Sequence, residues 1–180
     1  MSGDPFWHAI QAGQLDLPEP VLAFHRGLGT KHYAGECEIT RSRNWMLRLL
    51  LRMGKFPAEG QGVPVHLTLI TRPANAEWVR NFGGQMTRSQ MHWDAQRQVV
   101  TERFGPFSVD MRLTAENRVL LVRIAGLRVL GIPVPGWVRP HSATSEFVDD
   151  ADRFCFDVAA HLPIFGLLIR YRGWVVPEQG

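Results

Sequence analysis

Apolar and polar residues alternate with a period of two through most of the chain beyond residue 60. Successive side chains of a β-strand point to opposite faces, so this period predicts half-buried strands, for example at residues 63–69, 78–82 and 107–113. Turn residues separate these stretches, including the glycine pair at 83–84 and the Gly-Pro pair at 105–106. One turn in about 8 to 12 residues is typical of a meander of antiparallel hairpins.

The C-terminal part of the chain contains two strongly apolar runs, residues 154–158 and 167–176. Runs as hydrophobic as these do not suit the edge of a sheet, so they predict a hairpin that completes it. Residues 32–40 also alternate and form the first predicted strand, and a further strand is expected at residues 142–148. The pattern predicts about ten strands in all.

Before the first strand the pattern is helical. Asp4 and Pro5 suit the N-cap and the first position of a short helix that ends near Gly13. A second short helix is expected to begin at Pro18 or Pro20 and to stop at the glycines that follow.

A third helix is predicted at residues 43–53, with Ser42 as its N-cap, because leucine and methionine crowd this segment without a period of two. Two interpretations of it are open. Its leucines can plug one end of a barrel while its arginines face water. Alternatively, Arg43, Arg48 and Arg52 can dock on anionic lipid while the leucines insert.

Together these elements predict a mainly β protein of the α+β class. An antiparallel meander of about ten strands would form a barrel or a strongly curved sheet, with short N-terminal helices and one helix between strands 1 and 2. One domain is expected over residues 1–180, with a helical segment at 1–30 and a β-rich body at 31–177. Small lipid-carrier barrels share a helical insertion after their first strand, and this analogy favours an apolar or amphipathic ligand.

The composition suits a folded, soluble protein, since 45% of residues are hydrophobic and 21% are charged. Cys37 and Cys155 can form at most one disulfide, and residues 1–10 lack the basic region and apolar run of a signal peptide. The uncharged stretch at residues 158–169 is shorter than the roughly 20 apolar residues of a membrane-spanning helix. We therefore expect reduced thiols and a cytoplasmic protein, soluble or at most peripheral to the membrane.

The net charge of +3 is unevenly distributed. Residues 41–55 contain five basic residues and no acidic one, whereas acidic residues gather at 146–152. An anionic membrane surface is a possible partner of the basic segment, while no nucleic acid is expected because no recognised motif accompanies it. Trp137 lies in an expected loop at residues 127–140, which either contacts lipid or protein or is stiffened by its prolines and packs on the sheet.

Two charged residues occupy positions that should face inward. Arg80 lies two positions from both Trp78 and Phe82. Glu102 lies two positions from both Val100 and Phe104, so both charges point inward if these apolar residues do. A buried ion costs several kcal/mol unless it is paired. Arg80 can hold a carboxylate or phosphate inside a ligand cavity, with Glu102 or Tyr171 fixing its orientation. The alternatives are a structural Arg80–Glu102 pair, or strand ends that are wet on both faces.

Familiar catalytic and cofactor signatures are missing from the sequence. The Gly-Leu-Gly segment at 27–29 follows a helical pattern, lacks the third glycine of a dinucleotide loop and precedes a strand, so it predicts a helix stop. The seven histidines have no metal-binding spacing, and no nucleophile motif surrounds a serine or cysteine. We therefore predict no catalytic residue, no metal and no cofactor.

Several short motifs follow one another in a characteristic order. They are Phe82-Gly83-Gly84, Glu102-Arg103-Phe104-Gly105-Pro106, Leu130-Gly131-Ile132-Pro133-Val134-Pro135, Phe154-Cys155-Phe156-Asp157-Val158, Leu162-Pro163-Ile164-Phe165-Gly166-Leu167 and Tyr171-Arg172-Gly173-Trp174. With these motifs and the leucine-rich segment at 43–53, the chain from about Pro18 onward resembles the bacterial family of domains of unknown function 4166. The resemblance implies a stand-alone domain or a C-terminal attachment to a dehydrogenase-like domain, and it implies no activity.

Three functional hypotheses remain open. In the first, the protein binds a lipid-like or other apolar small molecule in an internal cavity, with Arg80 and Glu102 near its polar end. In the second, it is an accessory or catalytic domain that acts with a dehydrogenase-like partner, and Arg80, Glu102 and Tyr171 supply acid and base groups. In the third, it is a structural interaction domain that uses Trp137 and its neighbours.

Overall fold

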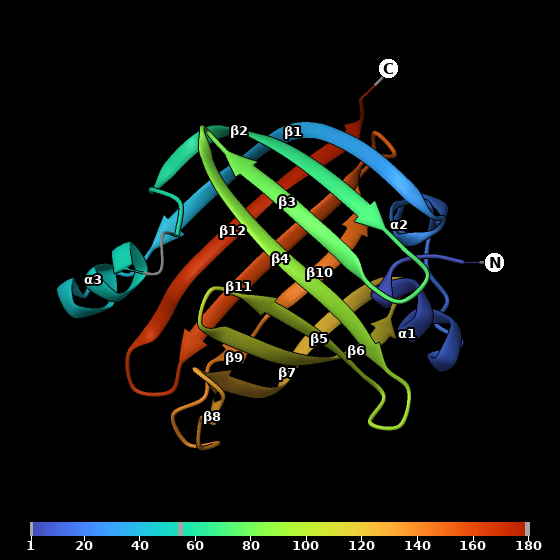
Figure 1. The fold of residues 1–180 in the computed structure, drawn as a ribbon. Helices are drawn as coiled ribbons and strands as arrows, with labels where there is room; N and C mark the ends of the chain where they lie inside the picture. Colours follow the sequence, from blue (N-terminus) through green and yellow to red (C-terminus); the bar gives the residue numbers. More distant parts are fainter. Residues whose placement is uncertain (1, 54–55, 179–180) are drawn as a thin grey trace.

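The computed structural model describes residues 2–53 and 56–178 (Figure 1). Its helices are α1 (Pro5–Gly13), α2 (Glu19–His25) and α3 (Trp45–Met53). Its strands are β1 (Gly29–Arg41), β2 (Gly60–Thr71), β3 (Ala76–Phe82), β4 (Gln85–Asp94), β5 (Val99–Phe104), β6 (Phe107–Glu116), β7 (Val119–Val129), β8 (Ile132–Pro133), β9 (His141–Ser142), β10 (Thr144–Val148), β11 (Phe154–Leu162) and β12 (Gly166–Pro177). Gly54, which was expected to end α3, and Lys55 of the basic segment lie outside the described residues.

Ten strands form a closed antiparallel barrel, which confirms the predicted fold class. Strands β1 to β7 pair in chain order, β7 pairs with β10, and β10 to β12 continue the path until β12 returns to β1. The short strands β8 and β9 pair with β7 and β11 outside this path. Figure 1 shows the strands wrapping around one axis, with α1 and α2 at one end and α3 at the other.

Two glycines let β1 and β12 approach closely where the barrel closes. Gly173 lies opposite Cys37, and a Cβ at position 173 would overlap the carbonyl oxygen of Glu36. Gly35 on β1 is under the same constraint, because a Cβ there would overlap the carbonyl oxygen of Trp174. A side chain at either position requires the backbone to move, since protein interiors are close-packed. Barrel closure therefore explains the glycine of the Tyr-Arg-Gly-Trp motif.

Helix α1 begins as the sequence predicts. Oδ1 of Asp4 accepts a hydrogen bond from the backbone N–H of Trp7 at 2.9 Å, Pro5 lies in the first turn, and the helix ends at Gly13. Helix α2 ends at His25, just before the predicted glycines. The ammonium of Lys31 donates to backbone carbonyls at the end of α2, including that of Ala23 at 3.0 Å. This satisfies acceptors that a helix C-terminus leaves free.

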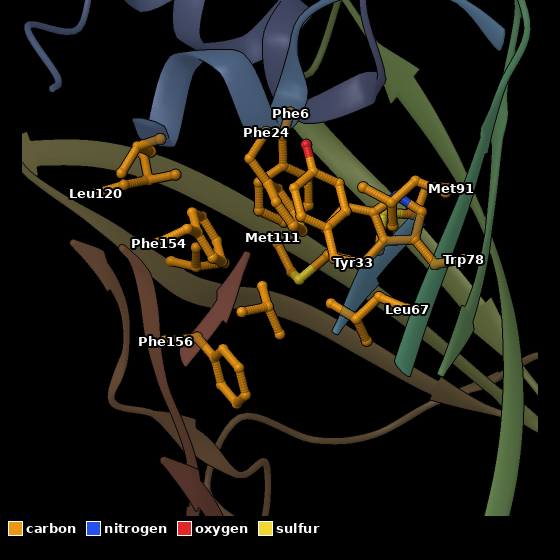
Figure 2. Close-up of a cluster of buried hydrophobic side chains, with 14 of the residues drawn as sticks. Phe6, Phe24, Tyr33, Leu67, Trp78, Met91, Met111, Leu120, Phe154 and Phe156 are labelled. Carbon is orange, nitrogen blue, oxygen red and sulfur yellow. The ribbon is translucent and has the colours of Figure 1, made fainter. Parts of the chain in front are cut away.

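Helices α1 and α2 close one end of the barrel with aromatic side chains. Figure 2 shows Phe6 and Phe24 pointing toward Trp78 and Phe154 of the barrel wall. The rings of Phe24 and Phe154 stack with their centroids 4.0 Å apart, and Phe24 also meets Trp78 edge to face at 5.7 Å. These contacts are typical of buried aromatic clusters and bury large apolar areas. We call this the closed end.

Helix α3 lies at the opposite, open end of the barrel and begins differently from the prediction. Its N-cap is Asn44, whose Oδ1 accepts a hydrogen bond from the N–H of Met46 at 2.9 Å. The predicted cap, Ser42, instead accepts from the N–H of Asn44 at 3.2 Å. Both residue types can cap a helix, so the sequence alone could not separate them.

Only some of the apolar residues of α3 can plug the end of the barrel, because others are exposed. Leu47 and Leu51 are buried, and Leu51 belongs to the hydrophobic core. Trp45, Met46 and Leu49 are exposed, however, so α3 also presents an apolar surface to solvent.

The predicted loop at residues 127–140 is wrong for its first residues, because β7 continues to its end at position 129. There it pairs with β6, with Leu127 opposite Val109. Pairing with a neighbouring strand overrides weak local preferences. Ile132 in β8 and Trp137 in the loop after it are exposed, so the Trp137 side chain does not pack on the sheet.

Candidate ligand-binding cavity

A cavity of about 300 Å³ lies inside the barrel. Its wall is mainly aromatic and aliphatic, with side chains from the capping helices, from the barrel strands and from the segment after α3. The apolar lining residues include Phe6, Phe24, Phe56, Leu67, Trp78, Phe82, Met91, Phe104, Val109, Met111, Val122, Ile124, Phe154, Phe156 and Ile169. A hollow of this size and character falls in the range of small-molecule sites.

Arg80 on β3 and Glu102 on β5 face this cavity, as their place among apolar neighbours predicts. Nη2 of Arg80 donates to Oε1 of Glu102 at 2.8 Å, and Nη1 donates to Oγ of Ser89, on the intervening strand β4, also at 2.8 Å. The side chains of Arg80 and Glu102 are 22% and 14% exposed. The two residues therefore form an ion pair, which was one of the alternatives left open by the sequence, and the pair lies on the cavity wall.

Trp78 lies next to this ion pair. The guanidinium of Arg80 lies 5.0 Å from the centroid of the Trp78 ring, and the ring of Phe6 stacks on Trp78 at 5.6 Å. The indole Nε1–H of Trp78 is buried and has no hydrogen-bond acceptor among the described residues. A buried donor without an acceptor costs about 1–3 kcal/mol. Trp78 therefore lines the cavity with its ring, while its N–H is an unsatisfied donor buried in the wall.

Phe82 and Tyr171 complete the set predicted from the sequence. Both line the cavity, and their rings stack with centroids 5.2 Å apart. Burial raises the pKa of the Tyr171 phenol above its usual range, and the nearby charge of Arg80 opposes this only in part. The hydroxyl is therefore protonated at neutral pH and available as a donor, which disfavours Tyr171 as a base.

A second polar cluster, which the sequence analysis missed, lies at the closed end. His25 is fully buried, and its Nδ1 donates to Oδ2 of Asp4 at 2.9 Å while its Nε2 donates to Oε2 of Glu146 at 2.7 Å. Burial alone would lower the pKa of His25, but the charges of Asp4 and Glu146 and the hydrogen bonds to them outweigh burial and raise the pKa to about 9. The ring of Phe6 stacks on the imidazole at 4.9 Å. An imidazolium between two carboxylates thus ties α1, α2 and β10 together.

Little in the sequence could have revealed this cluster. Asp4 is recognisable as an N-cap, but that role uses Oδ1 and says nothing of the second carboxylate oxygen. Glu146 is 121 positions from His25, and only closure of the barrel brings β10 beside α2.

Exposed apolar side chains gather around the open end of the barrel, where α3 and the turns between successive strands lie (Figure 1). We call this surface the open rim. Its exposed large apolar residues are Trp45, Met46, Leu49, Met86, Leu130, Ile132, Trp137, Ile164 and Phe165. None of the helices described in residues 2–53 and 56–178 is long and apolar enough to span a bilayer.

The open rim also carries the basic residues that the sequence singled out. Arg43, Arg48 and Arg52 line a cleft of about 900 Å³ beside α3, together with Arg41 and exposed Trp45. Trp137, from the loop after β8, lies at the same end of the barrel. The four predicted contact residues therefore share one end of the molecule.

Metal-binding and thiol chemistry have little support in the part of the chain that the structure describes. No group of three or more His, Cys, Asp or Glu side chains in that part is placed to hold a metal ion. Cys37 and Cys155 are buried free thiols, and burial raises the pKa of Cys37 to about 12. A thiol with so high a pKa is a poor nucleophile at neutral pH.

Comparison with known proteins gives one match. The model of the family described as Domain of unknown function (DUF4166) matches residues 17–175, which include α2, α3 and nearly the whole barrel. No curated protein and no solved structure matches the chain. Because the match covers most of the 180 residues, this protein belongs to the DUF4166 family of domains of unknown function.

Proposed function

We propose that the barrel reversibly binds a small, neutral amphipathic molecule, whose chain occupies the cavity and whose polar group lies beside Arg80, Glu102 and Trp78. The observation that carries this proposal is an apolar cavity of about 300 Å³ with an ion pair on its wall. Ligand pockets combine an apolar lining with a few polar groups that fix orientation.

The cavity volume sets the size of the ligand. An engineered apolar cavity of roughly 150 Å³ holds benzene, so a cavity twice as large suits about a dozen non-hydrogen atoms. A ten-carbon chain with one polar group has this size, whereas a two-chain membrane lipid is far larger. Each buried methylene contributes about 0.8 kcal/mol, so such a chain gives about 7 kcal/mol before the costs of binding. A dissociation constant between micromolar and millimolar follows.

The charges on the wall favour a neutral polar group over the carboxylate or phosphate suggested by the sequence. Both amino groups of Arg80 are already hydrogen-bonded, to Glu102 and to Ser89. A ligand carboxylate beside Arg80 would also approach Glu102, and like charges in a dry site repel strongly. A hydroxyl or carbonyl group meets no such repulsion.

Calorimetric titration with decan-1-ol and with decanoate at about pH 8, where a carboxylic acid is ionised, tests this assignment. We expect decan-1-ol to bind at least about tenfold more tightly than decanoate, because a tenfold ratio needs only about 1.4 kcal/mol of repulsion. Glu102→Gln removes the competing charge and releases Arg80, so this variant should gain affinity for decanoate. A wild-type preference for decanoate would contradict the proposed polar group.

Filling the cavity with a larger side chain tests where the apolar chain of the ligand binds. Val109 lines the cavity on β6, so Val109→Trp should abolish binding of decan-1-ol. Thr114→Trp adds the same side chain at an exposed position of the same strand and should bind like the wild type. Equal binding by both variants, with both folded by circular dichroism, would place the ligand outside the barrel.

A further inference from the structure

The open rim collects exposed apolar side chains from segments that are far apart in the sequence. Trp45 and Leu49 lie on α3, Trp137 follows β8, and Ile164 and Phe165 form the turn between β11 and β12. Trp45, Trp137 and Ile164 are 72%, 75% and 87% exposed. Neighbouring strands run in opposite directions, which brings all three segments to one end of the barrel. Apolar clusters of this kind mark interaction surfaces.

Basic residues gather at the open end of the barrel and an acidic turn lies at the closed end. Arg43, Arg48 and Arg52 are exposed at the open end, and the sequence has no acidic residue between positions 38 and 59. The acidic turn at residues 149–152 joins β10 to β11 at the closed end. A separation of charge of this kind turns the basic end of a molecule toward an anionic surface.

We propose that the open rim docks on the surface of a bilayer that contains anionic lipid. Trp45, Trp137 and Ile164 enter the interface between headgroups and acyl chains, where amphipathic aromatic rings are favoured. Arg43, just before α3, and Arg48 and Arg52 on it contact lipid phosphates, and each raises partitioning into the membrane about fivefold. This inference goes beyond the proposed ligand binding and does not require it.

Features of the rim favour a bilayer over a protein partner. The exposed residues of α3 include both arginines and apolar side chains, so Arg48 and Arg52 can reach outward to headgroups while Trp45 and Leu49 enter the bilayer. The other exposed apolar residues of the open rim lie in or next to separate turns between strands at the open end of the barrel. Phe56 lines both the cleft beside α3 and the internal cavity, so an apolar surface leads from the docked rim toward the ligand site.

Sedimentation with phosphatidylcholine vesicles, with and without about 30% phosphatidylglycerol, tests the proposal. We expect binding to the anionic vesicles that weakens at high salt, since surface charges are screened. The triple variant Arg43→Glu, Arg48→Glu, Arg52→Glu should lose at least about 100-fold in partitioning, three factors of about five. Arg72→Glu, Arg112→Glu, Arg123→Glu gives the same change in net charge at exposed sites away from the rim and should retain wild-type binding.

Brominated acyl chains provide a second measurement that does not depend on charge reversal. They should quench tryptophan fluorescence of the wild type, and Trp45→Ser with Trp137→Ser should remove most of this quenching. Equal loss of binding in the two arginine variants, absence of binding to either vesicle, or self-association through the rim without vesicle binding would each overturn the proposal.

Discussion

The buried His25 cluster makes the stability of the protein depend on pH near neutrality. The pKa of His25 rises from 6.5 to about 9 in the folded protein, because Asp4 and Glu146 hold the charged form. The folded state therefore binds a proton more tightly than the unfolded chain does. This contribution is fully present below about pH 6.5 and is lost as the pH rises through 9.

The size of this pH dependence follows from the shift in the pKa of His25. Each pKa unit corresponds to about 1.4 kcal/mol, so the full contribution of His25 to the free energy of unfolding is about 3 kcal/mol. Roughly 2 kcal/mol of this should disappear between about pH 6 and 8.5. Above that range the buried Cys37 thiol and Lys31, whose pKa is lowered by burial, add titrations of their own.

Urea denaturation, followed by far-ultraviolet circular dichroism across this pH range at constant salt, measures the effect. The free energy of unfolding of the wild type should fall with rising pH, with a slope that corresponds to the release of nearly one proton on unfolding. His25→Gln should be less stable than the wild type at about pH 6 and should lose most of this slope. His141→Gln, at an exposed position near the open end, should keep the wild-type slope. Equal slopes in wild type and His25→Gln, or a nitrogen chemical shift showing neutral His25 at about pH 7.5, would refute this reasoning.

Two further predictions concern the barrel wall. Gly173→Ala should destabilise the protein by about 1–3 kcal/mol, because the added methyl group overlaps the β1 backbone, whereas Gly136→Ala, in open space, should be nearly neutral in thermal unfolding. Wild-type thermal stability of Gly173→Ala would contradict the close approach of β1 and β12. Cys37 and Cys155 should react with a thiol reagent only in denaturant, and full labelling of native protein at neutral pH would contradict their burial.

The sequence predicts most of the barrel because its strands follow a period of two. The same period places Arg80 and Glu102 inside, since a charge two positions from inward-facing residues of a strand faces inward too. It does not reveal that β7 pairs with β10 as well as with the short strand β8, because residues 127–140 carry weak and conflicting local signals.

Features that depend on barrel closure could not be predicted. The contact between His25 and Glu146 requires β10 to lie beside α2. Likewise, Trp45 and Trp137 share one end only because an antiparallel barrel alternates the direction of its strands. The volume of the cavity depends on how all of these side chains pack, which the alternation of single strands does not specify.

The most direct test of the account is a crystal structure of the protein with a terminally brominated decanol. The account predicts an anomalous bromine peak inside the barrel and a hydroxyl oxygen within hydrogen-bond distance of the Arg80–Glu102 pair. Bromine found only on the outer surface, with the barrel interior filled by protein side chains, would contradict it.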